Sequence, residues 1–257
     1  MMTETAPFLD MKEVSFAYPG EAPIFERLTL ALARGDFHCL VGRSGCGKTT
    51  LLKCAAGLLQ PKVGVTVFNG KPLSKPSQDI GFVFQTPSLL EWRTVLDNVL
   101  LPIALHRRVT PEDHDRATGL LAQMGIADHA DRSPQHLSGG QQSRVALARA
   151  LVTDPPCLCM DEPFAALDAI TREELQNDLR QLTRANGTTV LFVTHDIAEA
   201  VRLASHVSVM DAGRITRSLR VDLPTLPSAG AQHAANVAAL CQEIRGALMP
   251  ASEAAEA

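Results

Sequence analysis

The alternation of hydrophobic and polar positions along the chain predicts strands that alternate with helices. Residues 25–32 (FERLTLAL) alternate apolar with polar side chains, which indicates a half-buried strand. Residues 37–41 and 157–160 are short apolar runs, as expected for parallel strands covered on both faces. Residues 95–105 and 170–185 instead place apolar side chains at helical spacing. This order of elements predicts an α/β fold with a largely parallel sheet.

Shorter segments complete the outline. Residues 9–16 (LDMKEVSF) are predicted to form an edge strand, and Asn69-Gly70 is a strong hairpin signal. Residues 206–219 suggest a final hairpin that turns through residues 211–213. Helical spacing dominates between residues 86 and 136, so we interpret this stretch as a helical insertion.

Composition narrows the classes of function. The 257 residues are 46% hydrophobic, enough for one large domain or two small ones, and the formal net charge of −4 gives no basic excess for nucleic acid. No stretch approaches about 18 consecutive apolar residues, so no segment is expected to span a bilayer. The first residues lack the charged and apolar regions of a signal peptide. The six cysteines match neither a zinc pattern nor a compact disulfide framework, which favours a reducing cytosolic compartment.

The strongest motif is residues 40–50, LVGRSGCGKTT, which match G-x-x-x-x-G-K-[ST] between a predicted strand and a predicted helix. Glycines let backbone N–H groups converge on an anion, and the positive end of the following helix points at the same anion. The charge of Lys48 suits the outer phosphates, and the Thr49 hydroxyl suits a hard cation such as Mg²⁺. A glycine-rich turn with a chance lysine is the alternative. The full motif in this setting predicts a loop that binds a nucleoside triphosphate.

An acidic pair follows the second apolar strand. Asp161 and Glu162 come directly after residues 157–160 and should therefore emerge at the carboxyl edge of a parallel sheet. Asp161 suits Mg²⁺ coordination, and Glu162 suits a general base that orients or polarises a water molecule. The alternative, a solvated acidic pair at a strand end, loses weight beside the phosphate loop.

A second anion site is predicted at residues 137–141, LSGGQ. Ser138 can cap the helix that begins here, while Gly139 and Gly140 leave its first N–H groups bare. A plain helix cap would need neither glycine. Gln85 and His195 each follow a predicted strand, where a polar side chain can face a ligand; either one alone is more often structural.

Together these motifs closely resemble those of the ATP-binding subunits of ABC transporters. The motifs that carry the resemblance are GRSGCGKT, Gln85, LSGGQ, CLCMDEP, ALD at 166–168 and His195. The resemblance covers about residues 8–222. It implies a P-loop NTPase core of the RecA type, an antiparallel β subdomain, and a helical subdomain at about residues 86–153. Residues 223–257 form a tail that carries no motif; its Ala-rich part at 231–249 is predicted to be at most a peripheral helix.

The resemblance also implies how nucleotide is bound. Two copies of the chain would sandwich two ATP molecules, each between the phosphate loop of one copy and residues Ser138, Gly139, Gly140 and Gln141 of the other. Tyr18 would stack on the adenine, and Asp168 would lie at the dimer contact. The phosphate-loop residues that would bind ATP are Gly42, Arg43, Ser44, Gly45, Cys46, Gly47, Lys48, Thr49 and Thr50.

The same resemblance implies the chemistry. Glu162, His195 and Gln85 would be the catalytic residues, with His195 contacting the γ-phosphate. Thr49, Gln85 and Asp161 would bind Mg²⁺.

A finer resemblance concerns the transported solute. FQTPSLLEWRTVLDNVLLP and DEPFAALDAITREEL are similar to the importer branch for nitrate, sulfonate and taurine, and some relatives serve pyrimidine precursors. Glu91, Ala165 and Ser143 depart from the usual residues of that branch. None of them touches the nucleotide motifs, but Glu91 and Ser143 weaken any inference about the solute. By this resemblance the chain would bind separate transmembrane permease subunits, and through them a substrate-binding protein, at the cytoplasmic face of the cell membrane.

Other classes of function remain to be weighed. A soluble ABC-type ATPase acting on DNA or the ribosome would usually carry a long coiled-coil insertion or a second cassette, and a regulator that does not hydrolyse ATP would not need Glu162 and His195. Residues 88–93, SLLEWR, are predicted to line the groove that grips the permease. The alternative for this segment is that Trp92 packs the insertion against the core.

Overall fold

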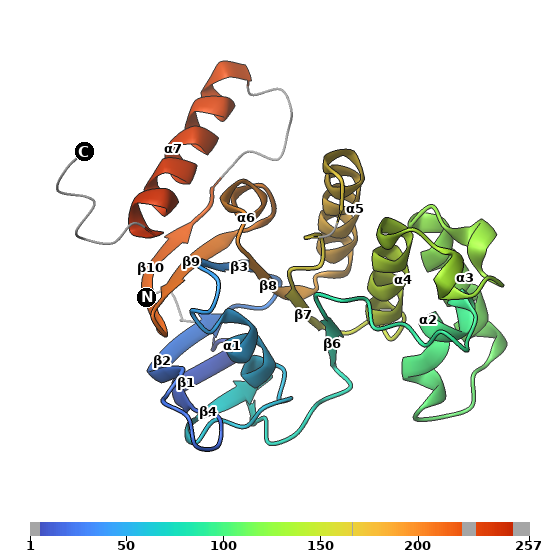
Figure 1. Ribbon diagram of the computed structural model, residues 1–257, viewed down its shortest axis with the longest axis horizontal. Coiled ribbons are helices and arrows are strands. Elements are labelled where there is room, and N and C mark those ends of the chain that lie inside the picture. The colour runs from blue at the N-terminus through green and yellow to red at the C-terminus, as the bar shows by residue number, and fades with distance from the viewer. Residues whose placement is uncertain (1–5, 166, 223–229, 249–257) are drawn as a thin grey trace. The chain divides into compact units, whose positions relative to one another are not determined.

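The computed structural model describes residues 6–165, 167–222 and 230–248. The chain divides into two compact units (Figure 1): the first holds the residues up to Ser77 and those from Thr189 onward, and the second holds Gln78–Thr188. Each unit is described separately below.

The first unit contains an antiparallel sheet. Its strands are β1 (Leu9–Phe16), β2 (Phe25–Leu32), β4 (Val63–Phe68) and β5 (Lys71–Pro72), in the order β2-β1-β4-β5. The Asn69-Gly70 signal is confirmed, because β4 and β5 form a hairpin around it. The edge assignment for residues 9–16 is wrong: β1 pairs with both β2 and β4. Its polar residues occupy an outward face rather than a free edge, since β1 buries alternate positions such as Leu9 and Met11.

The first unit also contains the parallel strands that carry the phosphate loop. Strand β3 (Phe37–Gly42) lies between β8 (Thr189–Thr194) and β9 (His206–Asp211), parallel to both. All six residues of β3 and of β8 are buried, as expected for strands covered on both faces. The predicted final hairpin is confirmed, because β10 (Arg214–Arg220) runs antiparallel to β9.

Three helices belong to this unit. Helices α1 (Lys48–Ala55) and α6 (Ile197–Leu203) both contact β3 and β8, and Figure 1 shows them on opposite sides of these strands. Helix α7 (Gly230–Leu248) packs on α6 and β9, with Ile244 fully buried. Arg217 on β10 forms an ion pair with Glu243 on α7. The helix predicted in the tail is thus present; residues 223–229 and 249–257 of the tail lie outside the described residues.

The second unit contains two parallel strands and four longer helices. Strand β6 (Ile80–Val83) pairs in parallel with β7 (Cys157–Asp161). Helices α2 (Val95–Ala104), α3 (Pro111–Gln123) and α4 (Gly139–Leu151) pack on one another, with the short 3₁₀ helices η1 (Ala127–His129) and η2 (Pro134–His136) before α4; α5 (Ala169–Asn186) follows β7. Helix α3 begins with a capping box formed by Thr110 and Asp113. The unit is wider than the predicted insertion because it includes β6, β7 and α5.

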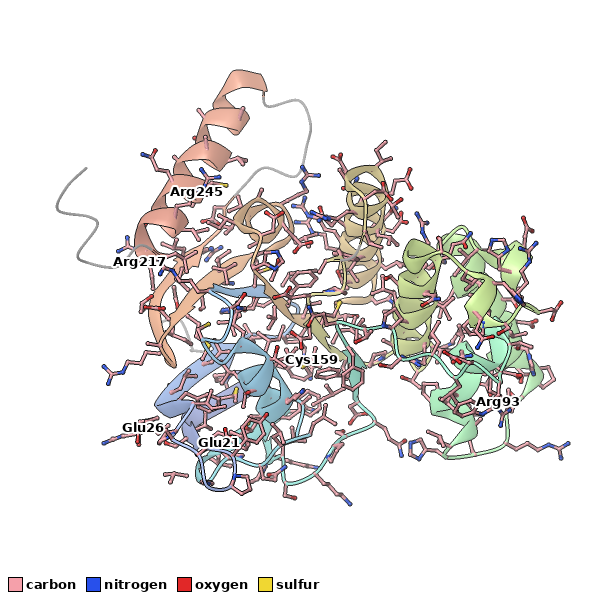
Figure 2. All side chains as sticks on the ribbon, viewed as in Figure 1. Glu21, Glu26, Arg93, Cys159, Arg217 and Arg245 are labelled. Carbon is pink, nitrogen blue, oxygen red and sulfur yellow. The ribbon has the colours of Figure 1, made fainter. Side chains whose placement is uncertain are left out.

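Two expectations about the whole chain can be compared with the structure. All six cysteines are free, and every one except Cys241 is buried, such as Cys159 inside the second unit (Figure 2). Within the part of the chain that the structure describes, no helix has the length and hydropathy needed to cross a membrane.

Candidate nucleotide site

The register of the parallel strands brings the phosphate loop and His195 to one edge of the first unit. Val41 of β3 pairs with Thr194 of β8. The residues that follow, Gly42 and His195, therefore leave neighbouring strands at their carboxyl ends. This is the edge where open α/β sheets bind ligands.

Two glycines of the loop are required by close contacts. A Cβ on Gly42 would lie 2.3 Å from the backbone oxygen of Met210, and a Cβ on Gly47 would lie 2.7 Å from Cγ2 of Ile24. Gly47 also has a φ of 104° and Gly45 a φ of 80°, which side chains rarely tolerate. Gly45 has no heavy atom within 4 Å of an added Cβ, so its backbone angle alone explains the glycine. The backbone path of the loop therefore depends on these glycines.

Lys48 begins α1 and is 6% exposed. Its Nζ donates hydrogen bonds of 2.9 Å to the backbone oxygens of Gly42 and Arg43, two consecutive residues at the start of the loop. The N-cap residue of α1, Gly47, offers no side-chain cap, and the first turn contains no acidic residue. The positive end of the helix and a buried ammonium group are therefore available to an anion.

Cys46 packs beneath this loop. Burial raises the pKa of its thiol, although the charge of Lys48 acts in the opposite direction. The thiol is therefore a small apolar filler here.

A hydrogen-bond network shapes the turn that carries His195. The hydroxyl of buried Thr194 donates to the carboxylate of Glu199 and accepts the backbone N–H of Asp196 at 3.0 Å. The Asp196 side chain in turn caps α6 by accepting the N–H groups of Ala198 and Glu199. His195 itself is exposed, so its side chain can meet a ligand.

In the second unit, strands β6 and β7 bring Gln85 and the acidic pair to a common edge. Val83 pairs with Met160 in parallel register, so Gln85 and Asp161-Glu162 both follow the carboxyl ends of these strands. Asp161 is buried at 5% exposure, and Gln85 is exposed. Glu162 has a φ of 44°, a conformation that costs a non-glycine residue about 1–3 kcal/mol and that gathers at functional sites.

The predicted second anion site is the amino terminus of α4. Ser138 and Gln141 form a capping box: the Ser138 N–H donates to Oε1 of Gln141 at 2.9 Å, and the Gln141 N–H donates to Oγ of Ser138 at 3.3 Å. Nε2 of Gln141 also lies 2.8 Å from Nε2 of His129. The side-chain amide of Gln141 is therefore engaged within its own unit, which the sequence did not indicate.

The two glycines of this motif differ. A Cβ on Gly140 would lie 3.2 Å from Cγ2 of Thr171, whereas a Cβ on Gly139 would meet nothing within 4 Å. Gly139 is exposed, and its own chain does not require a glycine there. A plain cap would not need it, so the space in front of Gly139 suits the close approach of another molecule.

Tyr18 and Asp168 make local contacts. The ring of Tyr18 packs edge-on against Phe16, with centroids 5.1 Å apart and an interplanar angle of 88°. Asp168 caps α5 by accepting the N–H groups of Ile170 and Thr171, and these bonds lower the pKa of its carboxyl group. Ala166, the first residue of the predicted ALD stretch, lies outside the described residues.

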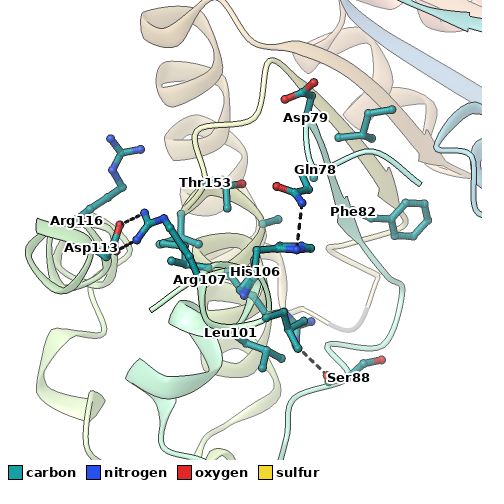
Figure 3. Close-up of a pocket in the computed structure, with 18 of the residues that line it drawn as sticks. Gln78, Asp79, Phe82, Ser88, Leu101, His106, Arg107, Asp113, Arg116 and Thr153 are labelled. Carbon is teal, nitrogen blue, oxygen red and sulfur yellow. Dashed lines mark hydrogen bonds and ion pairs between the residues drawn. The ribbon is translucent and has the colours of Figure 1, made fainter. Parts of the chain in front are cut away.

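Sequence reasoning missed a cavity of about 940 Å³ in the second unit (Figure 3). Apolar side chains from β6 and α2, including Phe82, Leu101 and Leu105, line it together with His106 and Arg107. Leu105 is 71% exposed, so the cavity has a solvent-exposed apolar side chain at its rim. These residues are scattered through the sequence and form no motif, so no local signal could have identified them.

The prediction that residues 88–93 line a groove for the permease stays a prediction. Ser88 lines the cavity, but Leu89, Leu90 and Trp92 are not among the residues around it. Trp92 is 78% exposed, which differs from the burial expected of a core side chain.

Comparisons with known proteins agree with this arrangement. A family model described as "ABC transporter" matches residues 25–165. The chain is 43% identical over 227 residues to the aliphatic sulfonates import ATP-binding protein SsuB of Cupriavidus pinatubonensis, covering 87% of this chain and 74% of that protein. It is also 43% identical over 215 residues to the taurine import ATP-binding protein TauB of Mesorhizobium japonicum, covering 82% of this chain and 84% of that protein.

A solved structure shares the fold. It is the dimeric post-hydrolysis state of the ATP-binding cassette MJ0796 bound to ADP and Pi, with a TM-score of 0.75 and 31% identity, covering 83% of this chain and 98% of that chain. The ABC ATPase fold predicted from the sequence is thereby confirmed. The chain belongs to the ABC transporter family and is an ABC transporter ATPase.

Proposed function

We propose that this protein is the ATP-hydrolysing subunit of an importer for a small anion of the sulfonate type. The observation that carries the ATPase role is the phosphate loop, in which a buried Lys48 stands at the start of a helix that has no side-chain cap. The same edge of the sheet presents His195.

ATP would bind with its phosphates in the loop of residues 42–50. The N–H groups of the loop and the positive end of α1 would hold the phosphate oxygens, and Lys48 would exchange its two carbonyl acceptors for the outer phosphates. Tyr18 would stack on the adenine.

Mg²⁺ fits the donor set of Thr49, Gln85 and Asp161, because hydroxyl, amide and carboxylate oxygens are its preferred protein ligands. Among the described residues, no cluster of three or more His, Cys, Asp or Glu side chains could hold a metal by itself. This is expected for a metal that takes most of its ligands from phosphates and water. When bound, Mg²⁺ supplies neutralisation of phosphate charge.

Glu162 would act as the general base. It would orient the attacking water and accept its proton, with His195 donating a hydrogen bond to the γ-phosphate and Gln85 approaching Mg²⁺. The unusual backbone angle of Glu162 is consistent with a carboxylate held in one fixed direction.

A second copy of the chain would complete each site. The exposed terminus of α4, with Ser138 and the two glycines, would face the γ-phosphate bound by the other copy, and Asp168 would lie at the dimer contact. The fold is shared with a cassette solved as a dimer with ADP and phosphate.

The partners would be separate transmembrane permease subunits at the cytoplasmic face of the cell membrane, and through them a substrate-binding protein. The cavity beside α2 offers apolar walls at Phe84 and Leu105 next to polar His106 and Arg107, which suits an amphipathic helix of the permease. The names of the sulfonate and taurine relatives point to the solute class.

Light scattering of Glu162→Gln protein with Mg²⁺ and ATP tests the composite site. We expect ATP to convert the monomer to a dimer, and Gly139→Glu, added to the same protein, to prevent this. The folded monomer should tolerate that change because nothing lies within 4 Å of the added Cβ. A monomer throughout would reject the composite site.

Deletion of the gene in its source organism, followed by uptake of labelled taurine, an alkanesulfonate, nitrate and orotate, tests the solute. Loss of sulfonate uptake is expected. Loss of orotate uptake alone would mean that the solute is a pyrimidine precursor and not a sulfonate. Unchanged uptake of all four compounds would reject this solute class.

A further inference from the structure

Arg149 on α4 is bonded to the backbone just after Gln85. Its Nη1 donates to the backbone oxygen of Ser88 at 2.9 Å (dashed line at Ser88 in Figure 3), and its Nη2 donates to that of Pro87 at 2.7 Å. A planar guanidinium that bonds two consecutive carbonyls fixes both the position and the orientation of the segment.

The held segment has an unfavourable backbone. Ser88 has a φ of 47°, which a non-glycine residue keeps only where its surroundings enforce it. Downstream, fully buried Asn98 on α2 accepts the N–H of Leu90 at 2.7 Å and donates to the Leu90 oxygen at 3.0 Å. Residues 87–90 are therefore attached to two helices, α4 and α2, and Gln85 lies two residues before this stretch.

Burying the guanidinium of Arg149 costs free energy that an apolar side chain at the same place would not cost. Burial lowers the pKa of its guanidinium, and its hydrogen bonds run to uncharged carbonyls. Arg149 and Ser88 also both line the cavity beside α2. Helix α4 thus carries Ser138 and Gly139 at its start and Arg149 in its last turn. The Arg149 side chain borders the cavity and fixes the segment after Gln85.

We propose that Arg149 is a positioning residue for Gln85, which it holds in its working place by fixing the carbonyls of Pro87 and Ser88. This inference rests on the role of Gln85 given above. Because Arg149 borders the cavity, a partner segment seated there would reach the same guanidinium and alter its hold on the segment.

The test compares Arg149→Gln, Arg149→Lys and wild type as purified full chains. Arg180→Gln is the matched control, since Arg180 is a half-buried arginine of the same unit whose pKa is also lowered by burial. Steady-state hydrolysis gives kcat and KM for MgATP, hydrogen exchange follows the amides of residues 85–90, and thermal melts report folding.

For Arg149→Gln we expect a kcat loss of about tenfold to a hundredfold, with KM changed less than about twofold, because misplacing a group costs turnover rather than binding. Exchange should rise in residues 85–90 and stay unchanged in α3. Arg149→Lys, which can still bond one carbonyl, should lose less activity, and Arg180→Gln should match wild type.

Wild-type kcat in Arg149→Gln would overturn the proposal, as would faster exchange throughout the second unit, which would mean a purely structural role. If Gln85→Ala retains full activity while Arg149→Gln still frees residues 85–90, the role of Gln85 fails instead. The two failures are therefore distinguishable.

Discussion

The ammonium group of Lys48 lies 2.9 Å from the backbone oxygen of Gly42, across the mouth of the loop that joins β3 to α1. The same group bonds Arg43 at equal distance. A buried ammonium with two carbonyl acceptors stabilises the loop and can move to phosphate when nucleotide arrives.

Replacing Lys48 should therefore weaken nucleotide binding strongly. We expect Lys48→Ala to raise the dissociation constant for MgATP by about ten- to a hundredfold, the loss typical of a charge-assisted hydrogen bond. Titration with a fluorescent ATP analogue measures this. Lys53→Ala, in the last turn of the same helix, should bind as wild type does, and equal affinity for all three proteins would exclude a phosphate contact by Lys48.

Tyr18 provides a test of adenine stacking. Because its edge-on contact with Phe16 needs only the ring, Tyr18→Phe should preserve both folding and affinity. Tyr18→Ala should weaken ATP binding severalfold, since aromatic stacking contributes about 1 kcal/mol. The affinity for ATP should be compared with that for inorganic triphosphate, because only ATP carries an adenine. A loss of affinity for both ligands would mean that Tyr18 packs its own turn and does not stack on the adenine.

The nucleotide motifs were predictable because each depends on a short run of residues. Glycines 42 and 47 are fixed by contacts within the first unit, and the strand ends that carry Glu162 and His195 follow from local apolar runs. Contacts between segments that are distant in the sequence were harder to predict. The assignment of β1 to the edge of its sheet was wrong. A strand inside a sheet with one outward face shows the same alternation of apolar and polar residues as a strand at a free edge. The bonds of Arg149 to Pro87 and of His129 to Gln141 join residues with no common motif.

The exposure of Trp92 gives a clear stability prediction. At 78% exposed, Trp92→Ala should change the free energy of unfolding by no more than about 0.5 kcal/mol, as for other surface positions. Thermal melts of the isolated chain measure this. Val99→Ala, at a fully buried position of α2, is the contrasting variant and should melt well below wild type. A drop for Trp92→Ala as large as that for Val99→Ala would contradict the exposed position.

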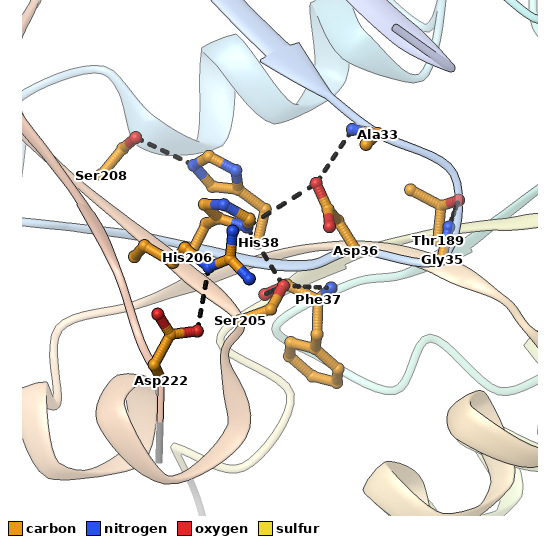
Figure 4. Close-up of polar contacts among 11 residues, drawn as sticks. Ala33, Gly35, Asp36, Phe37, His38, Thr189, Ser205, His206, Ser208 and Asp222 are labelled. Atoms are coloured by element: carbon orange, nitrogen blue, oxygen red, sulfur yellow. Dashed lines mark hydrogen bonds and ion pairs between the residues drawn. The ribbon is translucent and has the colours of Figure 1, made fainter. Parts of the chain in front are cut away.

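His38 should make the first unit sensitive to acid. It is buried against Ser208 and stacked on His206 (Figure 4), and burial, with the neighbouring His206, lowers its pKa to about 3. The unfolded chain protonates at its ordinary value near 6.5, so His38 stabilises the fold fully above about pH 6.5 and progressively less as pH falls toward 3.

From pH 6.5 to pH 5 the free energy of unfolding should fall by about 2 kcal/mol because of His38. Urea unfolding at the two pH values should show that loss in wild type and a smaller one in His38→Gln. The exposed His114→Gln should behave as wild type does. Equal pH dependence in His38→Gln and wild type would assign the acid sensitivity to other groups.

The central claim is that Glu162, at the carboxyl end of β7, is the base for ATP hydrolysis. Its most direct test is the turnover of purified Glu162→Gln beside its affinity for MgATP, with Glu173→Gln on α5 as the carboxylate control. We expect a kcat at least about a hundredfold below wild type with unchanged affinity, because the amide accepts no proton. Near wild-type hydrolysis by Glu162→Gln would contradict it.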